Sequence, residues 1–279
     1  MKILLVANSG WYLYNFRSTL INDIKKNGYD LNIISPSDKY SGILKKQNIN
    51  HVQWDLSRES INPLKEFKSL VDLVFIYRKL KPDIIHHFTI KACIYGTIAA
   101  KFSNTKKVVN SITGLGHLFV GKKLSTKILK AFLLPIYRLV FNAKRSNMIF
   151  QNEDDLNEFI NFKLTNKESS RLIKGSGIDI KKFSNSNKEI LVNYHSPIRL
   201  LFPSRLIIEK GIIELLDACK NLWDQNYNFD LYIAGEPNDA NRSVISKKVL
   251  EDIKNNKRIK SLGHVKNMKA LFERMDIVI

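Results

Sequence analysis

Residues 83–117 have the sequence DIIHHFTIKACIYGTIAAKFSNTKKVVNSITGLGH, and this stretch decides the fold that we predict. The apolar run 83–88 is typical of a buried strand, 92–103 of a helix, and 107–112 of a second strand. Two strands joined by a crossover helix run parallel in one sheet. The stretch therefore predicts a βαβ unit of a parallel sheet.

The same alternation continues on both sides of this unit. Apolar runs predict further strands at 3–7, 31–34, 51–56 and 148–151, with helices between them. One helix begins at Asn62-Pro63, and its apolar face consists of Leu64, Phe67, Leu70, Val71 and Val74. We expect residues 1–174 to form a Rossmann-like, doubly wound α/β domain.

Residues 175–197 interrupt the alternation. Gly175-Ser176-Gly177 opens a polar, irregular segment, which we interpret as an interdomain linker. From 198 to 279 the pattern starts again, with strands expected at 199–202, 231–234, 259–262 and 276–279. We expect a second Rossmann-like domain there, and an incomplete one, because the sequence stops within a strand of the buried type.

Composition excludes several classes of protein. With 44% hydrophobic and 10% aromatic residues in 279, the chain is not disordered. No apolar run approaches the ~18–20 residues of a membrane span, and the N-terminus lacks a signal-peptide pattern. The two cysteines, Cys93 and Cys219, are far apart, which argues against a disulfide framework or a cysteine-based zinc site. We expect a folded cytoplasmic protein.

Positive charge is concentrated in one stretch. The chain has 45 Lys and Arg against 26 Asp and Glu, a net charge of +19. Residues 84–152 contain 11 Lys and Arg and no Asp or Glu. This predicts an anionic partner, which could be nucleic acid, a phosphorylated ligand or an acidic membrane surface. A generally basic composition is the simpler alternative.

Ligands of doubly wound sheets bind where strands end, so the loops that follow the strands are the candidate sites. Asn8-Ser9-Gly10 follows the first strand, with Arg17 on the next helix. Gly10 would let the backbone approach a ligand, and the helix N-terminus favours an anion, although a tight turn explains the glycine equally well. The pattern GxGxxG of dinucleotide sites is absent.

Two more loops of the first domain carry candidates. His86, His87 and Lys91 surround the end of the strand at 83–88. Adjacent residues of a strand point to opposite faces, so the two histidines are not expected to share a metal, and one of them is expected in the core. The other histidine, or Lys91, could contact a phosphate or a sugar hydroxyl. Thr113-Gly114 begins a glycine-containing loop that is either a ligand-binding loop or an ordinary turn.

The fourth loop, SRLIIEKG at 204–211, lies in the second domain between a strand and a helix. Arg205 and Lys210 could bind one anion together, and a diphosphate is the natural ligand. In the alternative interpretation the loop is solvated and Glu209 pairs with Lys210. The sequence contains no nucleophile elbow, Walker loop or cluster of metal ligands.

Five segments, in order, resemble the family-4 glycosyltransferases of GT-B fold, and in particular the bacterial members that extend lipid-linked sugars for surface polysaccharides. The segments are FTIKACIYG (88–96), NSITGLGHLF (110–119), FQNEDDLNEF (150–159), GSGIDIKKF (175–183) and SRLIIEKGIIEL (204–215).

The resemblance implies a nucleotide-sugar donor on the C-terminal domain and an acceptor on the N-terminal domain. It implies retention of the anomeric configuration, no metal and no other cofactor. Arg205 and Lys210 would neutralise the leaving diphosphate. The implied binding residues are Gly10, Arg17, His87, Lys91, Thr113, Gly114 and Gly177. We therefore expect transfer of a hexose or N-acetylhexosamine from a UDP-sugar to a polyprenyl-diphosphate-linked saccharide.

Two departures from the family pattern bear on this expectation. The sequence ends before two glutamates that contact the donor in family members, so a truncated, inactive remnant is an alternative. Ala92-Cys93 stands where Pro-Asn is common. A basic nucleic-acid-binding protein lacks a recognition motif here, and we expect no nucleic-acid partner. A sugar-nucleotide epimerase of the same fold is disfavoured by the FTIK and TGLG segments.

A membrane contact is expected at residues 122–145. Basic residues, Lys122, Lys123, Lys127 and Lys130 among them, flank the apolar run AFLLPIYRLVF at 131–141. This pattern is typical of a surface helix on anionic lipid, and it predicts a peripheral enzyme on the inner face of the cytoplasmic membrane. A helix packed in the core with a basic edge is the alternative.

Overall fold

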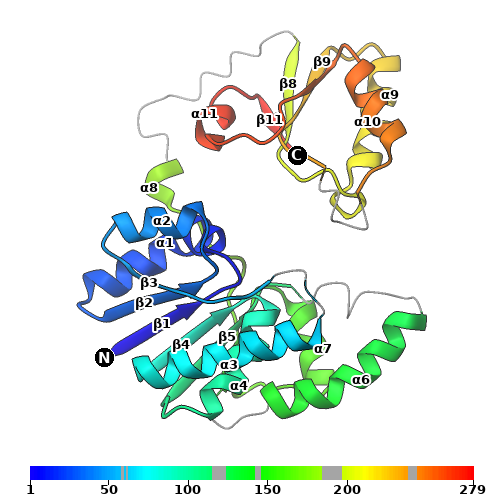
Figure 1. The fold of residues 1–279 in the computed structure, drawn as a ribbon. Helices are drawn as coiled ribbons and strands as arrows, with labels where there is room; N and C mark the ends of the chain where they lie inside the picture. Colours follow the sequence, from blue (N-terminus) through cyan, green and yellow to red (C-terminus); the bar gives the residue numbers. More distant parts are fainter. Residues whose placement is uncertain (58–59, 61, 115–123, 142–145, 184–196, 238–243) are drawn as a thin grey trace. The chain divides into compact units, whose positions relative to one another are not determined.

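The computed structural model describes residues 1–57, 60, 62–114, 124–141, 146–183, 197–237 and 244–279, with backbone alone at 124–132 and Lys182. The chain forms two compact units, Met1–Ile180 and Lys181–Ile279 (Figure 1). The boundary between them lies within the segment 175–197. Each unit is described by itself below.

The first unit is built on a parallel sheet of seven strands in the order β3-β2-β1-β4-β5-β6-β7. The βαβ unit predicted from 83–117 is confirmed, because β4 and β5 are parallel neighbours joined by α4. The strands are β1 (Lys2–Val6), β2 (Asp30–Ser35), β3 (Asn50–Gln53), β4 (Ile84–Phe88), β5 (Lys107–Ile112), β6 (Ser146–Phe150) and β7 (Ser170–Leu172).

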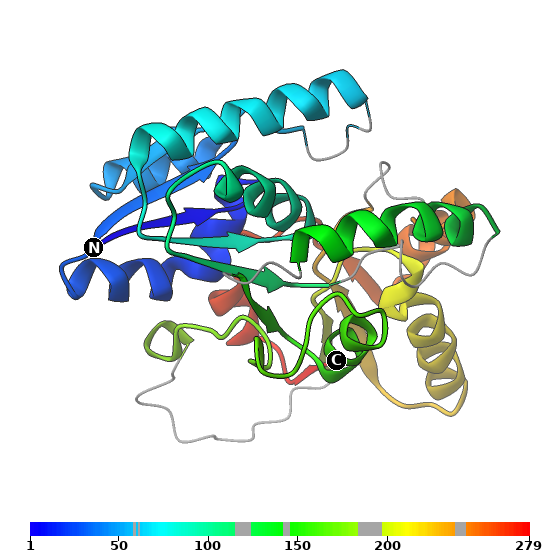
Figure 2. The ribbon, with the colours of Figure 1, turned by 90° about the horizontal axis from the view of Figure 1, so that it is seen from below.

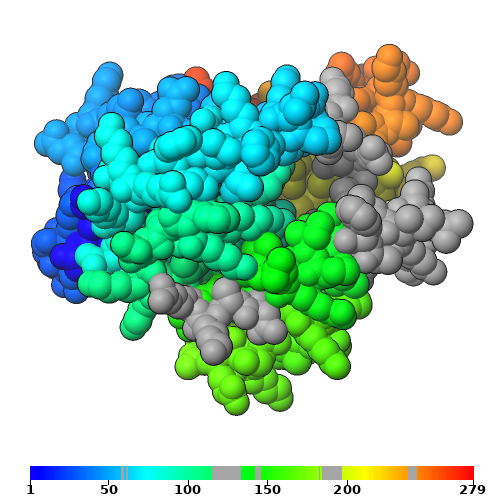
Figure 3. Space-filling model, turned by 60° about the horizontal axis from the view of Figure 1, so that its bottom comes forward, coloured from blue at the N-terminus to red at the C-terminus, as the bar shows by residue number. Residues whose placement is uncertain are grey.

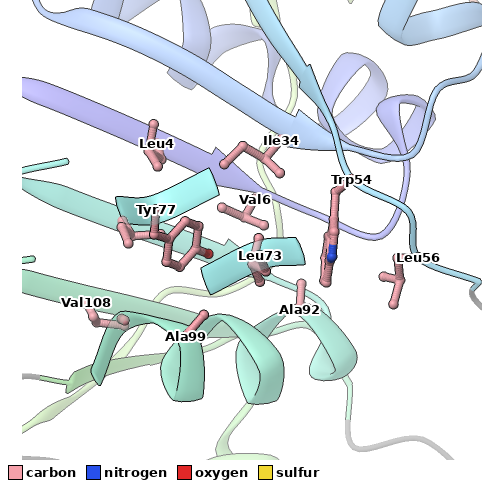
Figure 4. Close-up of a cluster of buried hydrophobic side chains, with 12 residues drawn as sticks. Leu4, Val6, Ile34, Trp54, Leu56, Leu73, Tyr77, Ala92, Ala99 and Val108 are labelled. Carbon is pink, nitrogen blue, oxygen red and sulfur yellow. The ribbon is translucent and has the colours of Figure 1, made fainter. Parts of the chain in front are cut away.

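Helices cover both faces of this sheet, as Figure 2 shows for α1 and α3. On one face Leu5 of β1 packs with Leu13 of α1 and Leu44 of α2. On the other, Leu4 packs with Leu73 and Tyr77 of α3 (Figure 4). The helices are α1 (Gly10–Lys26), α2 (Lys39–Lys46), α3 (Pro63–Leu80), α4 (Ile90–Lys101), α6 (Leu124–Phe141), α7 (Glu153–Asn161) and α8 (Ile180–Phe183).

The start of α3 was predicted correctly, but its apolar face was not. Asn62 caps the helix by accepting hydrogen bonds from the backbone N–H groups of Leu64 and Lys65 at 3.0 and 3.4 Å. Leu70 and Val74 pack against the core, together with fully buried Leu73 and Tyr77. Leu64 and Phe67 instead point to solvent, because α3 carries apolar residues on two sides and packs with only one of them.

Two further details differ from the expectation. The strand predicted at 51–56 ends at Gln53, where Trp54 turns into the core and its indole N–H donates to the Ser69 carbonyl at 2.8 Å.

The helix α2 was not predicted because it is short and mostly polar. A reciprocal capping box starts it: the Asp38 carboxylate accepts from the backbone N–H of Ser41, and the Ser41 hydroxyl accepts from that of Asp38.

The helix α6 falls within the segment predicted to contact a membrane. In its C-terminal half Tyr137, Val140 and Phe141 are buried against the core, whereas Ile136 and Leu139 are exposed. The side chains of Lys127 and Lys130 and the whole of Lys122 and Lys123 lie outside the described residues. None of the helices in the described ranges has the length and hydropathy that a bilayer span requires.

The second unit contains a parallel four-stranded sheet in the order β10-β9-β8-β11. Its core includes Leu231 and Ile233 of the sheet with Ile212 and Cys219 of α9. The strands are β8 (Ile198–Phe202), β9 (Phe229–Ile233), β10 (Ile259–Ser261) and β11 (Ile277–Val278). The helices are the 3₁₀ turn η1 (Ile208–Lys210), α9 (Ile212–Asp224), α10 (Lys247–Asn255) and α11 (Met268–Phe272).

Candidate functional site

The carboxyl ends of β1, β4, β5 and β6 lie along one edge of the first sheet because these strands are parallel neighbours. This edge is where ligands of doubly wound sheets bind. The loops that the sequence singled out in the first unit all begin there. The structure, however, gives their side chains different roles.

Gly10 is explained by packing between two helices. A Cβ at this position would lie 2.4 Å from the Asp38 carboxylate and 2.7 Å from the backbone nitrogen of Ser41. The same carboxylate accepts a hydrogen bond from the backbone N–H of Trp11 at 2.9 Å. Asp38 therefore already provides an anion at the start of α1, where a ligand phosphate was considered from the sequence.

Arg17 lies at the carboxyl end of the sheet with part of its hydrogen-bonding capacity unused. Its guanidinium lies over the Phe88 ring, 4.6 Å from the centroid, and one Nη donates to the Tyr12 hydroxyl at 2.6 Å. Its Nε is buried and has no hydrogen-bond partner among the residues that the structure describes. A buried guanidinium N–H without a partner loses solvation without compensation, so this cation is well suited to a ligand anion.

The two neighbouring histidines contact groups on opposite faces of the sheet, as their alternation on β4 predicted: His87 contacts Tyr77 of α3, and His86 contacts the Phe88 ring. His87 is fully buried: Nδ1 lies 2.7 Å from Asn110 Oδ1 and Nε2 lies 2.9 Å from the Tyr77 hydroxyl. Burial lowers the pKa of His87 to about 4, so the ring is neutral at physiological pH. The binding role that the resemblance gave to His87 has no support here, because both ring nitrogens already have partners in the core.

His86 is the histidine on the side of Arg17. It is half-buried, its Nε2 lies 2.7 Å from the Ser111 hydroxyl, and its ring is 4.1 Å from that of Phe88. Burial, and then the nearby positive charge of Arg17, lower the pKa of His86 to about 3. A neutral imidazole that contacts a serine hydroxyl can take part in a hydrogen-bond network without adding charge to the site.

Thr89, which follows β4, was not singled out from the sequence. It has a φ of 74°, which is rare for a β-branched residue. Its hydroxyl oxygen is buried, and no described residue forms a hydrogen bond with it. Strained backbone of this kind is concentrated at functional sites. A threonine between an apolar run and a helix gives no sequence signal of this strain, because φ depends on the packing around it.

Lys91 forms hydrogen bonds and an ion pair within the first unit, so its side chain is not available to a ligand. Its Nζ donates to the carbonyls of Ser57 and Ser60, each at 2.8 Å, and pairs with the Glu66 carboxylate at 2.9 Å. Tyr95 donates to the same carboxylate. Burial raises the pKa of Glu66, but the hydrogen bonds from Tyr95 and Lys91 outweigh it, so the net shift is downward. The three donor positions of Lys91 are thus occupied within the protein.

The remaining candidates of the first unit lie at the strand ends. Thr113 and Gly114 follow β5 directly, and the loop beyond Gly114 lies outside the described residues. Gly177 follows Ser176, whose hydroxyl accepts from the Gln151 amide at 2.9 Å and is also hydrogen-bonded to Tyr12. The structure thus brings the segment around Gly177 to Tyr12 and Arg17, and it separates His87 and Lys91 from this group.

In the second unit Arg205 and Lys210 lie in the loop between β8 and α9. Both are exposed, and neither side chain has an ion pair or hydrogen bond with another residue of the described part. The pairing of Lys210 with Glu209, considered from the sequence, is not among the ion pairs of the described residues. Two unneutralised cations in one loop at a strand end can receive a multiply charged anion.

The loops after β9 and β10 complete this edge, and sequence reasoning missed them. A Cβ on Gly235 would lie 1.9 Å from the carbonyl oxygen of Ser204, so the loop after β9 touches the loop that carries Arg205. The Glu236 carboxylate accepts from the backbone N–H of His264, after β10, at 3.1 Å. The pairs Ala234-Gly235 and Gly263-His264 after apolar strands were the available sequence signal.

No group of three or more His, Cys, Asp or Glu side chains within the described ranges is placed to hold a metal ion. Both cysteines are buried, and burial raises the pKa of the Cys219 thiol to about 11 and that of Cys93 further. Neither thiol is activated as a nucleophile in this environment.

Comparison with known proteins identifies the family of the chain. The family model described as Glycosyl transferase 4-like matches residues 2–152, and the model described as Glycosyl transferases group 1 matches residues 183–279. An N,N'-diacetylbacillosaminyl-diphospho-undecaprenol alpha-1,3-N-acetylgalactosaminyltransferase of Campylobacter jejuni is 25% identical over 287 residues, which cover 100% of this chain and 74% of the relative. The capsular polysaccharide biosynthesis glycosyltransferase CapM of Staphylococcus aureus is 24% identical over 269 residues, covering 93% and 67%.

Two solved structures share the fold. A glycosyltransferase from Rickettsia africae superposes with a TM-score of 0.71 at 18% identity, over 99% of this chain and 72% of that one. Anabaena HepE, solved in complex with UDP and glucose, superposes with a TM-score of 0.70 at 19% identity, over 100% and 73%. With two parallel α/β units of this fold and both family models matched, the chain belongs to the family-4 type of glycosyltransferases with the GT-B fold, and it is a hexosyltransferase.

Proposed function

We propose that this glycosyltransferase transfers a hexose or N-acetylhexosamine from a UDP-sugar to a polyprenyl-diphosphate-linked saccharide, with retention of the anomeric configuration. The reaction takes place at the inner face of the cytoplasmic membrane, which the protein contacts through residues 122–145. The observation that carries the proposal is the pair of exposed cations Arg205 and Lys210 at a strand end of the second unit, neither of which forms an ion pair with another described residue.

The donor half of the proposal rests on charge. When a sugar leaves a nucleoside diphosphate, negative charge develops on the β-phosphate. Arg205 and Lys210 need not break an existing ion pair to meet this charge, because neither has one in the described part. A nucleoside diphosphate is also the ligand named for Anabaena HepE, which was solved with UDP. Donor binding through these two cations requires no metal.

The acceptor half rests on the edge of the first unit. In the described part of the chain, the buried Nε–H of Arg17 and the buried hydroxyl of Thr89 have no hydrogen-bond partner. A phosphate adjoining a saccharide offers acceptors for both groups. The name of the Campylobacter jejuni relative specifies a saccharide linked through diphosphate to undecaprenol. We propose the same class of acceptor for this chain, with Arg17 on its diphosphate.

UDP affinity of the intact chain tests the donor assignment. Titration calorimetry should show at least a tenfold weaker Kd for Arg205→Ala and for Lys210→Ala, because a charge-assisted hydrogen bond contributes about 1.5–3 kcal/mol. Lys220→Ala is the matched control, since Lys220 is an exposed cation on α9. Unchanged UDP affinity in both loop variants would refute the donor site.

The products test the reaction. Each of several UDP-sugars should be incubated with a polyprenyl-diphosphate saccharide, and the anomeric coupling constant of the new linkage measured by NMR. The proposal predicts that the new linkage has the same anomeric configuration as the donor sugar. A product with the opposite configuration would contradict it. Arg17→Met should raise the KM for the acceptor without changing the Kd for UDP. An equal KM in Arg17→Met would exclude this residue from the acceptor site.

A further inference from the structure

The outer side of α3 carries an apolar stripe that the fold does not use. Leu64, Phe67 and Phe75 are 81%, 67% and 64% exposed, and half-buried Val71 lies between them in the sequence. The spacings of three, four and four residues place all four on one side of a helix. We call these four residues the α3 stripe. Phenylalanines so exposed at helical spacing form a continuous patch, unlike the scattered apolar residues of ordinary surfaces.

The stripe is not part of an incomplete core. The opposite side of α3 is already packed, with Leu73 and Tyr77 fully buried against the sheet (Figure 4). The helix is also fixed through the Ser69 carbonyl, which accepts from the Trp54 indole. Leu73 lies two residues from both Val71 and Phe75, so the packed side and the α3 stripe face opposite directions.

Positive charge surrounds the stripe. Lys65, Lys68, Arg78 and Lys79 lie on exposed positions of the same helix. Of the two acids of α3, Glu66 is turned inward to Lys91 and Tyr95, which leaves Asp72. Within the described ranges, the one ion pair of these four residues joins Lys68 to Asp55 at 3.5 Å. Both side chains are about 70% exposed, so the pair is weak and leaves this surface basic.

We propose that the α3 stripe docks on an anionic lipid bilayer, with its apolar side chains in the headgroup–acyl boundary and its lysines and arginine on lipid phosphates. An apolar stripe edged by basic residues is the pattern of a helix that lies in a membrane interface. A second copy of the chain is a poorer partner, because two such basic helices would repel one another. The inference rests on the proposed function in that an acceptor on a lipid brings the enzyme to a bilayer.

This surface differs from the one expected at 122–145. α4 lies between α3 and α6 and contacts both, so α3 and α6 share one layer of the first unit. Figure 3 looks onto the face where α3 (cyan) and α6 (green) are both in view. Leu139 of α6 is 73% exposed in that layer. A protein docked through α3 would thus present α6 to the bilayer from the same face of the unit. Unlike the segment 122–145, the α3 stripe consists entirely of described residues.

Flotation of the full chain with vesicles tests the inference. The vesicles contain phosphatidylglycerol and phosphatidylcholine in equal parts, and neither donor nor acceptor is added. The double variant Phe67→Gln, Phe75→Gln should bind at least tenfold more weakly, because each ring removes part of the ~1.5–3 kcal/mol that burial of a phenylalanine provides. Leu64→Gln changes the most exposed position of the stripe and should weaken binding several-fold. It is a milder substitution than the double variant and serves as a second test. Tyr29→Ser is the control, since Tyr29 is 41% exposed and lies outside α3, in the turn between α1 and β2.

The charged residues are tested separately. Lys65→Gln with Lys68→Gln should reduce binding to the mixed vesicles about 30-fold, since each lysine near an anionic surface contributes about 1 kcal/mol. The same variant should not differ from the parent on pure phosphatidylcholine. Full binding by the phenylalanine and Leu64 variants would overturn the inference. So would a parent dimer in lipid-free solution that the phenylalanine variants convert to monomers, because the stripe would then be a self-association surface.

The outcome is separable from that of the proposed function. UDP affinity measured on the same variants should be unchanged, because α3 and the donor loop lie in different units. Loss of vesicle binding by the stripe variants supports docking even if the Arg205 and Lys210 variants keep their UDP affinity. If the stripe variants bind vesicles as well as the parent does, docking through α3 is refuted, even if the donor site is confirmed.

Discussion

Replacement of Gly96 by alanine is the sharpest test of the His87 environment. Gly96 lies in α4, and a Cβ there would be 2.1, 2.3 and 2.7 Å from three atoms of the His87 ring. Such distances force the ring to move, and it cannot move while keeping its hydrogen bonds to Tyr77 and Asn110. Overpacking contributes a loss of about 1–3 kcal/mol, and one broken buried hydrogen bond a further ~1–3 kcal/mol.

The gain in helix propensity from glycine to alanine offsets about 1 kcal/mol of this loss. The expected net destabilisation is therefore about 3 kcal/mol, which for a unit of this size lowers Tm by about 10 °C. Urea unfolding followed by circular dichroism measures the free energy, and thermal melting measures Tm. Gly42→Ala is the matched control, because Gly42 is also inside a helix but its Cβ would meet nothing within 4 Å. This control should be neutral or stabilised by up to about 1 kcal/mol.

A double-variant cycle identifies the cause. In a His87→Ala background the ring is gone, so Gly96→Ala should lose much less stability than it does in the parent. If Gly96→Ala behaves like Gly42→Ala, or if the effects of His87→Ala and Gly96→Ala add, the steric reasoning is wrong and the His87 ring does not occupy the space beside α4.

Acid should destabilise the first unit: the pKa of His87 is lowered to about 4 from 6.5, so its contribution is complete above pH 6.5 and is lost as pH falls toward 4, about 3 kcal/mol in all. Urea unfolding at pH 7.5 and 4.5 measures this, and equal stabilities would contradict it. Lys91→Met should lower stability by about 2 kcal/mol with UDP affinity unchanged, and its effect should be less than additive with Glu66→Gln, because the two share one ion pair. Asp276→Asn should destabilise the second unit by about 1–2 kcal/mol, since its carboxylate accepts from the Arg199 guanidinium at 3.0 and 3.1 Å; a melt unchanged from the parent would exclude this bond as a stabilising contact.

The parallel sheets were predictable from the sequence because buried parallel strands are continuous apolar runs. The segments 83–88 and 107–112 correspond closely to β4 and β5 for this reason. The cap at Asn62 was predictable as well, because an N-cap is a local interaction. The apolar side of α3 was not, since a helix with two apolar sides does not reveal which of them meets the sheet.

The candidate site was predictable only as a set of loops. Strand ends can be located from the sequence, and Arg205 and Gly177 do lie in the loops that follow them. Arg17 lies within α1, but its guanidinium lies over Phe88, the last residue of β4. Which side chains remain available depends on contacts between distant residues, such as those of Lys91 with Glu66 and of His87 with Asn110. Glu236 was missed because its role depends on a backbone N–H from another loop. Charge and loop position are local properties of a sequence, whereas an unoccupied hydrogen-bonding group is a property of the fold.

The contact between Gly235 and Ser204 has a consequence for engineering. The loops after β8 and β9 touch backbone to backbone, and Leu206 and Glu236 are joined by a main-chain hydrogen bond of 3.3 Å. A segment grafted from a relative to alter sugar choice would have to match its neighbour without any side chain to absorb a misfit. Chimaeras at this edge should therefore exchange 203–207 and 234–237 together, as one cassette, because either loop transplanted alone would meet a surface shaped for its original partner.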